Sequence, residues 1–159
     1  MDLPVGKPTQ KFLLRPATIA DTAAVTECVY KSFGHYVERI GRKPGPMLMD
    51  YHQEILEHQV SVVESDGQIV GVLVLCIMEE GFLLDVIAVD PLYQGIGIGK
   101  FMLEFAESEA RRQGYKSIYL YTHEKMTENR VLYAKVGYIE YDRRLEMGLA
   151  RVYMRKKLV

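Results

Sequence analysis

The alternation of apolar and polar residues along the chain predicts an α/β protein. Strict alternation and short apolar runs indicate strands, whereas apolar residues three and four positions apart indicate amphipathic helices. The predicted strands are Phe12–Arg15, Val60–Ser65, Ile69–Met78, Phe82–Val89, Tyr115–Tyr121, Tyr138–Tyr141 and Arg151–Leu158. The predicted helices are Asp21–Phe33, Met47–His58, Gly97–Arg112 and Thr127–Val136.

The turns between these elements indicate how the strands pair. Asp66-Gly67 is a hairpin turn and Glu79-Glu80-Gly81 turns the chain again, so three consecutive strands should pair antiparallel. The strand–helix–strand unit over residues 82–121 predicts a right-handed parallel crossover. We therefore expect a single-domain, mixed, mostly antiparallel sheet of about six to seven strands flanked by about four helices. Residues 1–10 are expected to form a loose lead-in to this domain.

Composition and charge limit the function classes. The 159 residues carry 20 basic and 21 acidic side chains, which gives a formal net charge of -1. No nucleic-acid partner is expected, because a broad nucleic-acid footprint needs a basic excess. The longest apolar run, Ile69–Met78, is too short to span a bilayer, and residues 1–10 contain no apolar signal core. The sequence therefore predicts a cytoplasmic protein without a membrane partner.

The cysteines and histidines predict neither a disulfide nor a metal centre. Cys28 and Cys76 are far apart and belong to no CxxC pair, so reduced, packed thiols are expected. The four histidines lack metal-ligand spacing; they are His35, His52, His58 and His123.

The most informative stretch joins the strand that ends at Val89 to the helix that begins at Gly97. It reads Gln94-Gly95-Ile96-Gly97-Ile98-Gly99-Lys100. Alternating glycines permit a tight turn, and the start of a helix offers free N–H groups that attract phosphate. A Walker A loop would need glycine in place of Gln94, and a dinucleotide fingerprint would need glycine in place of Lys100.

The remaining pattern, Q-G-x-G-x-G, resembles the pyrophosphate-binding signature of the GNAT superfamily of N-acetyltransferases, which use acetyl coenzyme A (acetyl-CoA). The resemblance extends from Phe12 to Leu158 in the order of the elements. It implies that Gln94 to Lys100 hold the pyrophosphate. It also implies that the strand ending Ile87-Ala88-Val89 splays at a bulge and pairs with the pantetheine arm of acetyl-CoA.

A second segment carries the same resemblance. Thr127 to Tyr138 is similar to the family's second cofactor motif, which includes an Asn and, four residues later, a Tyr; these are Asn129 and Tyr133 here. Residues four apart project from one helix face. An amide can hydrogen-bond the cofactor's arm, and a phenol that is protonated at neutral pH can donate a proton to a departing thiolate. Tyr133 is thus the predicted general acid, and a purely packed aromatic residue is the alternative.

An amine acceptor must lose a proton before it attacks. At pH 7 this deprotonation costs an alkylammonium about 4–5 kcal/mol, and a carboxylate in the cleft could take the proton. Asp85 interrupts the apolar strand Phe82–Val89, and the resemblance implies that an acidic residue here faces the acceptor. Glu79, Glu80 and water are the competing bases.

These residues predict an N-acetyltransferase that moves acetyl from acetyl-CoA to a primary amine by direct attack in a ternary complex, without a metal. The segment His35–Tyr51 resembles the family's acceptor-binding side, but its mixed charges do not favour one acceptor, and His123 is expected at the surface. A small molecule is favoured over a protein as acceptor. A non-catalytic module that binds the coenzyme, transfer of a longer acyl group, transfer to a hydroxyl and homodimer formation all stay open.

Overall fold

The structure is a computed structural model in which residues 12–159 are described, so the predicted lead-in over residues 1–10 lies outside the described part. The strands are β1 (Leu13–Pro16), β2 (Gln59–Ser65), β3 (Gln68–Met78), β4 (Gly81–Val89), β5 (Ser117–His123), β6 (Ile139–Glu146) and β7 (Leu149–Lys157). The α-helices are α1 (Thr22–Phe33), α2 (Tyr36–Ile40), α3 (Tyr51–Glu57), α4 (Ile98–Arg112) and α5 (Thr127–Lys135). Three short 3-10 helices are η1 (Ile19–Asp21), η2 (Gly45–Leu48) and η3 (Pro91–Tyr93). Over residues 12–159, no helix combines the length and the apolar character that a membrane span needs.

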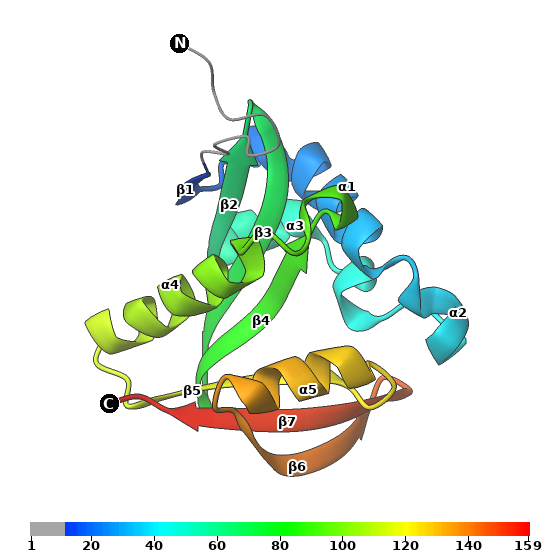
Figure 1. Cartoon of the computed structure of the whole chain (residues 1–159), viewed down its shortest axis with the longest axis vertical. Helices are drawn as coiled ribbons and strands as arrows, with labels where there is room; N and C mark the ends of the chain where they lie inside the picture. The colour runs from blue at the N-terminus through cyan, green and yellow to red at the C-terminus, as the bar shows by residue number, and fades with distance from the viewer. Residues whose placement is uncertain (1–11) are drawn as a thin grey trace.

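The seven strands form one mixed sheet in the order β1-β2-β3-β4-β5-β7-β6, which confirms the predicted fold class. Every neighbouring pair is antiparallel except β4 and β5, the predicted parallel crossover. That parallel pair is short: it joins only Leu83 to Tyr119 and Leu84 to Leu120. Beyond Leu84 the two strands diverge, and Figure 1 shows β2, β3 and β4 running in a different direction from β5, β7 and β6. The sheet is therefore split at its centre.

A β-bulge lies where the split begins. Val74 pairs with Val86 and the next residue of β3, Leu75, pairs with Leu84, so Asp85 has no partner on β3. An extra residue of this kind bends its strand and increases the local twist. The bulge that the family resemblance implies is thus present. It bends β4 away from β5 and leaves the β5-facing edge of β4 unpaired from Asp85 onward.

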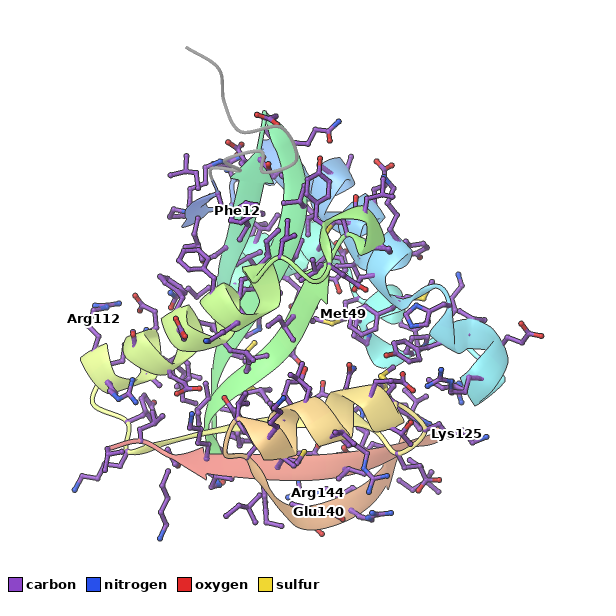
Figure 2. All side chains as sticks on the ribbon, in the orientation of Figure 1. Phe12, Met49, Arg112, Lys125, Glu140 and Arg144 are labelled. Atoms are coloured by element: carbon purple, nitrogen blue, oxygen red, sulfur yellow. The ribbon has the colours of Figure 1, made fainter. Side chains whose placement is uncertain are left out.

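Side chains pack on both faces of the sheet and form two cores (Figure 2). One core lies under α1 and α3 and includes Val25, Val29 and Tyr51. The other lies under α4 and includes Met102 and Ala106 of α4 and Tyr133 of α5. Burial of apolar stripes from both faces holds the split sheet together in spite of the missing β4–β5 hydrogen bonds.

Three segments differ from the sequence-based expectation. The helix expected over Met47–His58 begins only at Tyr51, because η2 precedes it and Asp50 caps α3 by accepting a hydrogen bond from the Gln53 N–H at 3.2 Å. The additional helix α2 was not expected; it has only five residues and is capped after Ile40 by Gly41, whose φ is 87°. Strand β6 runs to Glu146 rather than Tyr141, because pairing with β7 stabilises a strand that shows little apolar alternation.

A partly buried ion pair joins the outer strand β1 to the segment that leads into α1. The Arg15 guanidinium donates to both carboxylate oxygens of Asp21 at 2.8 and 3.0 Å, and also to Glu64 on β2 at 2.7 Å. These bonds lower the pKa of Asp21 from 3.8 to about 2. A carboxylate whose pKa is depressed by folding stabilises the protein above its unfolded pKa, and that contribution is lost as the pH falls through the folded value.

We expect Asp21→Asn to lower the free energy of unfolding by about 1–2 kcal/mol at pH 7. The native pKa of Asp21 lies near 2 and the unfolded value near 3.8. The difference in free energy of unfolding between the variant and wild type should therefore shrink between pH 4 and pH 2. Urea unfolding of both proteins across this pH range measures it. Glu38→Gln, on the exposed side of α2, is the control, and an equal pH dependence for the two variants would contradict the prediction.

Candidate active site

The glycine turn adopts the backbone conformation that its sequence predicts. Gly95 and Gly97 have φ values of 82° and 98°, in the left-handed region that favours glycine. Gly97 caps α4, and its carbonyl accepts the Phe101 N–H at 3.0 Å. The N–H groups of the first helical turn have no carbonyl within the helix to bond, so they are available to an anion. A Cβ added at Gly95 or Gly97 would meet no atom within 4 Å, so glycine is required here by the backbone and not by crowding.

A large cavity lies between this turn, β4, α1 and α5. Its lining includes nine of the residues predicted from the sequence: Ile87, Val89, Gln94, Gly95, Ile98, Gly99, Lys100, Asn129 and Tyr133. Three of the predicted cofactor-binding residues do not line it. The Ala88 side chain is buried in the core on the opposite face of the sheet, Ile96 is exposed, and Gly97 acts through the backbone of the helix start.

The large cavity also contains residues that the sequence reasoning missed. Lys135, in the last turn of α5, lines it together with Lys100, so two ammonium groups from different helices face the same space. Ser32 of α1 contributes its hydroxyl oxygen, which accepts the Val89 N–H at 3.3 Å. Ser32 belongs to no sequence motif, and Lys135 lies in the segment Thr127–Tyr138 but was given no role there. The packing of α1 and α5 beside β4 places both residues at the cavity.

A smaller cavity adjoins the large one and is lined by residues of both β4 and β5, where the sheet is split. Phe33, Ile87, Asn129 and Tyr133 line both cavities, so the two spaces meet at these residues. The smaller cavity is additionally lined by Asp85, Tyr121, His123 and Arg151, by Pro44 to Pro46 of the segment before α3, and by Leu149. The predicted pair Asn129 and Tyr133 therefore does share one helix face, and that face looks into the split.

Tyr133 lies at the junction in an apolar setting. It is 7% exposed, and its ring packs edge-to-face on Tyr138 with the centroids 5.9 Å apart. Burial raises the pKa of Tyr133 well above that of a free phenol, so the hydroxyl keeps its proton at neutral pH. Within residues 12–159, no side chain or backbone group forms a hydrogen bond with this hydroxyl.

Asp85 projects from the bulge into the smaller cavity. One of its carboxylate oxygens accepts the Tyr121 hydroxyl at 2.7 Å, and the other accepts the Cys76 thiol at 3.8 Å. Tyr121, on β5, is a site residue that the sequence reasoning missed; its only sequence signal is alternation with Tyr119 on the strand. Each carboxylate oxygen has a second lone pair, so Asp85 retains capacity for a further donor.

The other acidic candidates lie elsewhere. Glu80 pairs with Arg144 of β6 at 2.5 Å, and neither Glu79 nor Glu80 lines either cavity. His123, expected at the surface, instead lines the smaller cavity. Its Nδ1 accepts the Lys125 N–H at 3.1 Å, and burial lowers its pKa, so the ring is neutral at pH 7 with the Nε2 atom protonated.

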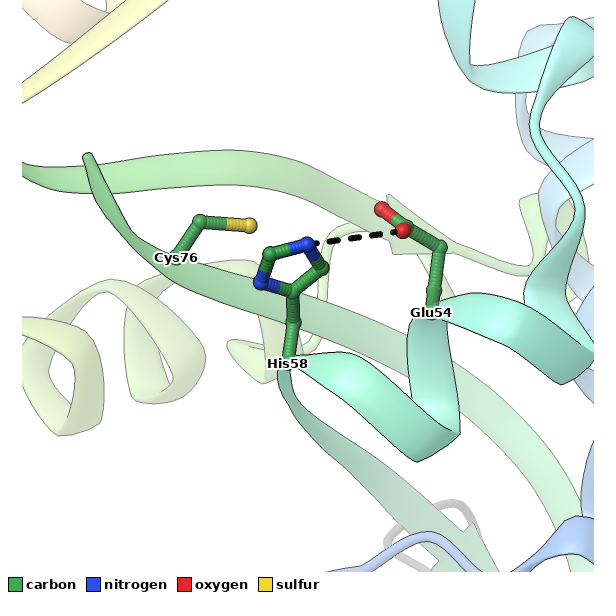
Figure 3. Close-up of side chains that lie close together, drawn as sticks. All are labelled: Glu54, His58 and Cys76. Atoms are coloured by element: carbon green, nitrogen blue, oxygen red, sulfur yellow. Dashed lines mark ion pairs between the residues drawn. The ribbon is translucent and has the colours of Figure 1, made fainter.

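Behind Asp85, three further polar side chains come together on the α3 face of the sheet (Figure 3). Glu54 of α3 and His58, the residue that caps the C-terminal end of α3, lie with Cys76 of β3 so that one ligand atom from each is within 4.8 Å of the others. Sequence spacing does not reveal this trio, because Cys76 belongs to a different element. Burial raises the pKa of both the Cys76 thiol and the Glu54 carboxyl, and a metal would need both groups deprotonated. We interpret the trio as the polar surroundings of Asp85, which accepts the Cys76 thiol.

The comparisons with known proteins agree with the split sheet and the glycine turn. Residues 57–140 match the family model described as an acetyltransferase (GNAT) domain. The match covers more than half of the chain, so the protein belongs to the GNAT acetyltransferase family. No curated protein matches the sequence significantly.

Solved structures share the fold over nearly the whole chain. The PaiA N-acetyltransferase of Thermoplasma acidophilum, in complex with coenzyme A, is 20% identical with a TM-score of 0.77, covering 92% of this chain and 99% of its own. The IAA acetyltransferase of Bacillus cereus is 18% identical with a TM-score of 0.70, covering 93% and 100%. A GNAT acetyltransferase of Elizabethkingia anophelis with acetyl-CoA bound is 20% identical with a TM-score of 0.67, covering 92% and 98%.

Proposed function

We propose that this protein is an N-acetyltransferase that passes the acetyl group of acetyl-CoA directly to a primary amine. The observation that carries the proposal is the position of Tyr133, which lines both cavities where they meet, with Asp85 in the smaller one. In this proposal the donor occupies the large cavity and the acceptor the smaller. The thioester and the amine then meet beside the Tyr133 hydroxyl.

The large cavity has features that suit the donor. The N-terminus of the 15-residue helix α4 and the ammonium groups of Lys100 and Lys135 favour a pyrophosphate. The unpaired edge of β4 beyond Leu84 can form strand-like hydrogen bonds with the amides of a pantetheine arm. Asn129 can bond the same arm from the other side of the cavity. The coenzyme A and acetyl-CoA bound to two neighbouring structures support this choice of donor.

The proposed reaction needs one proton acceptor and one proton donor. Asp85 takes a proton from the acceptor's ammonium group, and the free amine attacks the carbonyl carbon of the thioester. A C–N bond forms and the C–S bond breaks, and the departing thiolate receives the proton of the Tyr133 hydroxyl. The nitrogen then gives its second proton to the Tyr133 phenolate, which restores the hydroxyl, and Asp85 releases its proton to solvent. The high pKa of Tyr133 keeps that proton in place until the thiolate forms.

A covalent acyl-cysteine route has no support in the site. Neither Cys28 nor Cys76 lines either cavity, in the part of the chain that the structure describes. Burial raises the pKa of Cys28 to about 12, and the pKa of Cys76 is raised further by burial next to Asp85. Both thiols are therefore protonated and poor nucleophiles at neutral pH.

Acetyl-CoA at about 100 times its dissociation constant should stabilise the folded protein by about 2.7 kcal/mol. For a protein of this size, that stabilisation raises the melting temperature by roughly 5–10 °C. ATP and NAD at equal concentration should have no comparable effect. Gly97→Ala should weaken the stabilisation by acetyl-CoA, whereas Gly114→Ala, also at positive φ but beyond the far end of α4, should not. Stabilisation by ATP or NAD alone would overturn the donor assignment. Stabilisation by acetyl-CoA without turnover of any amine would favour the non-catalytic module.

A further inference from the structure

The smaller cavity contains a guanidinium that the proposed chemistry does not use. Arg151, on β7, lines the cavity, and its side chain is only 11% exposed. The guanidinium carbon of Arg151 lies 4.3 Å from the centroid of the Tyr121 ring. Burying a guanidinium costs free energy unless its N–H groups are bonded, so the partners of Arg151 decide what the cavity can bind.

Arg151 is weakly satisfied within residues 12–159. Its one hydrogen bond is to Glu146 at 3.4 Å, and the same carboxylate oxygen already accepts the Tyr153 hydroxyl at 2.5 Å. By comparison, Arg144 on β6 pairs with Glu80 at 2.5 Å and with Asp142 at 2.8 Å. A guanidinium has five donors in a planar fork that fits a carboxylate. Arg151 thus keeps most of its donors for a ligand in the cavity.

Arg151 and Asp85 both contact Tyr121, at different parts of its side chain. The Tyr121 hydroxyl donates to Asp85 at 2.7 Å, and the Tyr121 ring contacts Arg151 through its face. The two charges are therefore separated by no more than one phenol ring and these two contacts. A small molecule with an ammonium group and a carboxylate on the same carbon can reach both Asp85 and Arg151.

The histidine that lines the cavity adds no charge. His123 pairs directly with Arg151 across β5 and β7, so both side chains lie on the same face of the sheet. The pKa of His123 is lowered by burial, and its protonated Nε2 can donate a further hydrogen bond. Phe33, Met126 and Leu149 supply apolar walls. The cavity thus presents one negative and one positive site with apolar surface between them.

We propose that the acceptor is a free amino acid or a close analogue, with its ammonium on Asp85 and its carboxylate on Arg151. This inference rests on the proposed acetyltransferase function and narrows its substrate class. A polyamine would place a second cation against Arg151. A lysine or amino terminus of a protein has no free carboxylate beside its amine. Arg151 is therefore a specificity-determining residue for acceptors that carry an anion next to the amine.

The test compares each common amino acid with its own amide, which has the same shape but no carboxylate. Acetyl-CoA-dependent thiol release gives kcat/KM for both, and the acid should exceed the amide by about 100-fold, the value of a charge-assisted bidentate pair. The comparison is conservative, because the amine of the amide is less basic and is more often free to attack. Arg151→Gln should remove the preference, and Arg151→Lys should restore part of it.

The control variant is Arg155→Gln. Arg155 lies four residues along β7 on the same face and packs over Tyr119 at 4.9 Å, as Arg151 packs over Tyr121, but it does not line the cavity. This variant should keep the wild-type ratio of acid to amide. Thermal stabilisation by acetyl-CoA, measured on every variant, shows whether each one is folded.

The outcomes separate this inference from the proposed function. Equal rates for acids and amides, or a preference that Arg151→Gln leaves intact, would overturn the amino-acid assignment and leave the acetyltransferase standing. Transfer only to polyamines would do the same. If no amine, amino acid or amide is acetylated although acetyl-CoA binds, both proposals fail. If Arg151→Gln does not fold, the ratio of kcat/KM for acid and amide in the wild-type protein still tests the inference, and equal values would overturn it.

Discussion

Replacement of Tyr133 by phenylalanine is expected to lower kcat by about 100-fold, the usual contribution of a positioned general acid. The substitution keeps the ring, its edge-to-face contact with Tyr138 and the shape of both cavities, and it removes only the hydroxyl. The affinity for acetyl-CoA should therefore change little. Steady-state kinetics with the best amine acceptor, combined with thermal stabilisation by acetyl-CoA, separates the two effects.

The matched control for this variant is Tyr138→Phe. Tyr138 is the ring partner of Tyr133, but its hydroxyl is buried without a hydrogen-bond partner in the described part of the chain. Removing an unsatisfied buried hydroxyl should leave kcat unchanged and leave the protein equally or more stable. An unchanged kcat for Tyr133→Phe, under conditions in which chemistry limits the rate, would end the role of Tyr133 as general acid.

Replacement of Asp85 by asparagine is expected to lower kcat/KM by about 100-fold at pH 7. Asparagine can still accept the Tyr121 hydroxyl, so the bulge should keep its shape, but it cannot take a proton from the acceptor. The variant then depends on free amine in solution, which increases about tenfold per pH unit below the amine's own pKa. The difference from wild type should therefore narrow as the pH rises toward 10, and a pH–rate profile of both proteins measures it.

Glu79→Gln is the control for the base, since Glu79 is exposed in the turn between β3 and β4 and lines neither cavity. It should keep the wild-type profile. If Asp85→Asn also kept the wild-type pH–rate profile, water would be the base that takes the proton of the acceptor's ammonium group, and Asp85 would have a binding role only.

Local sequence patterns were sufficient for most of the fold. The strands β2, β3 and β4, the crossover to β5 and the helix α4 follow from apolar periodicity and from the Asp66-Gly67 and Gly81 turns. The segments that were misjudged depend on non-local contacts. The polar strand β6 exists because β7 supplies its hydrogen bonds, and α2 is too short for any periodicity to show.

The donor half of the candidate site was also predictable from the sequence. Gln94 to Lys100 and Asn129 with Tyr133 are contiguous motifs, because a turn at positive φ demands glycine and a helix places residues four apart on one face. Their meeting in one cavity depends on the split between β4 and β5. Lys135, in the same segment as Asn129 and Tyr133, lines that cavity through the packing of α5.

By itself, the sequence determined the α/β fold, the phosphate-attracting glycine turn and the resemblance to the GNAT acetyltransferases. The acceptor side was decided by the tertiary structure. Asp85, Tyr121 and Arg151 lie on three different strands, and only the bulge in β4 and the antiparallel pairing of β5 with β7 bring them to one cavity. The physical reason is the separation along the chain: a turn or a helix face is set by residues a few positions apart, whereas these three side chains come from segments far apart in the sequence.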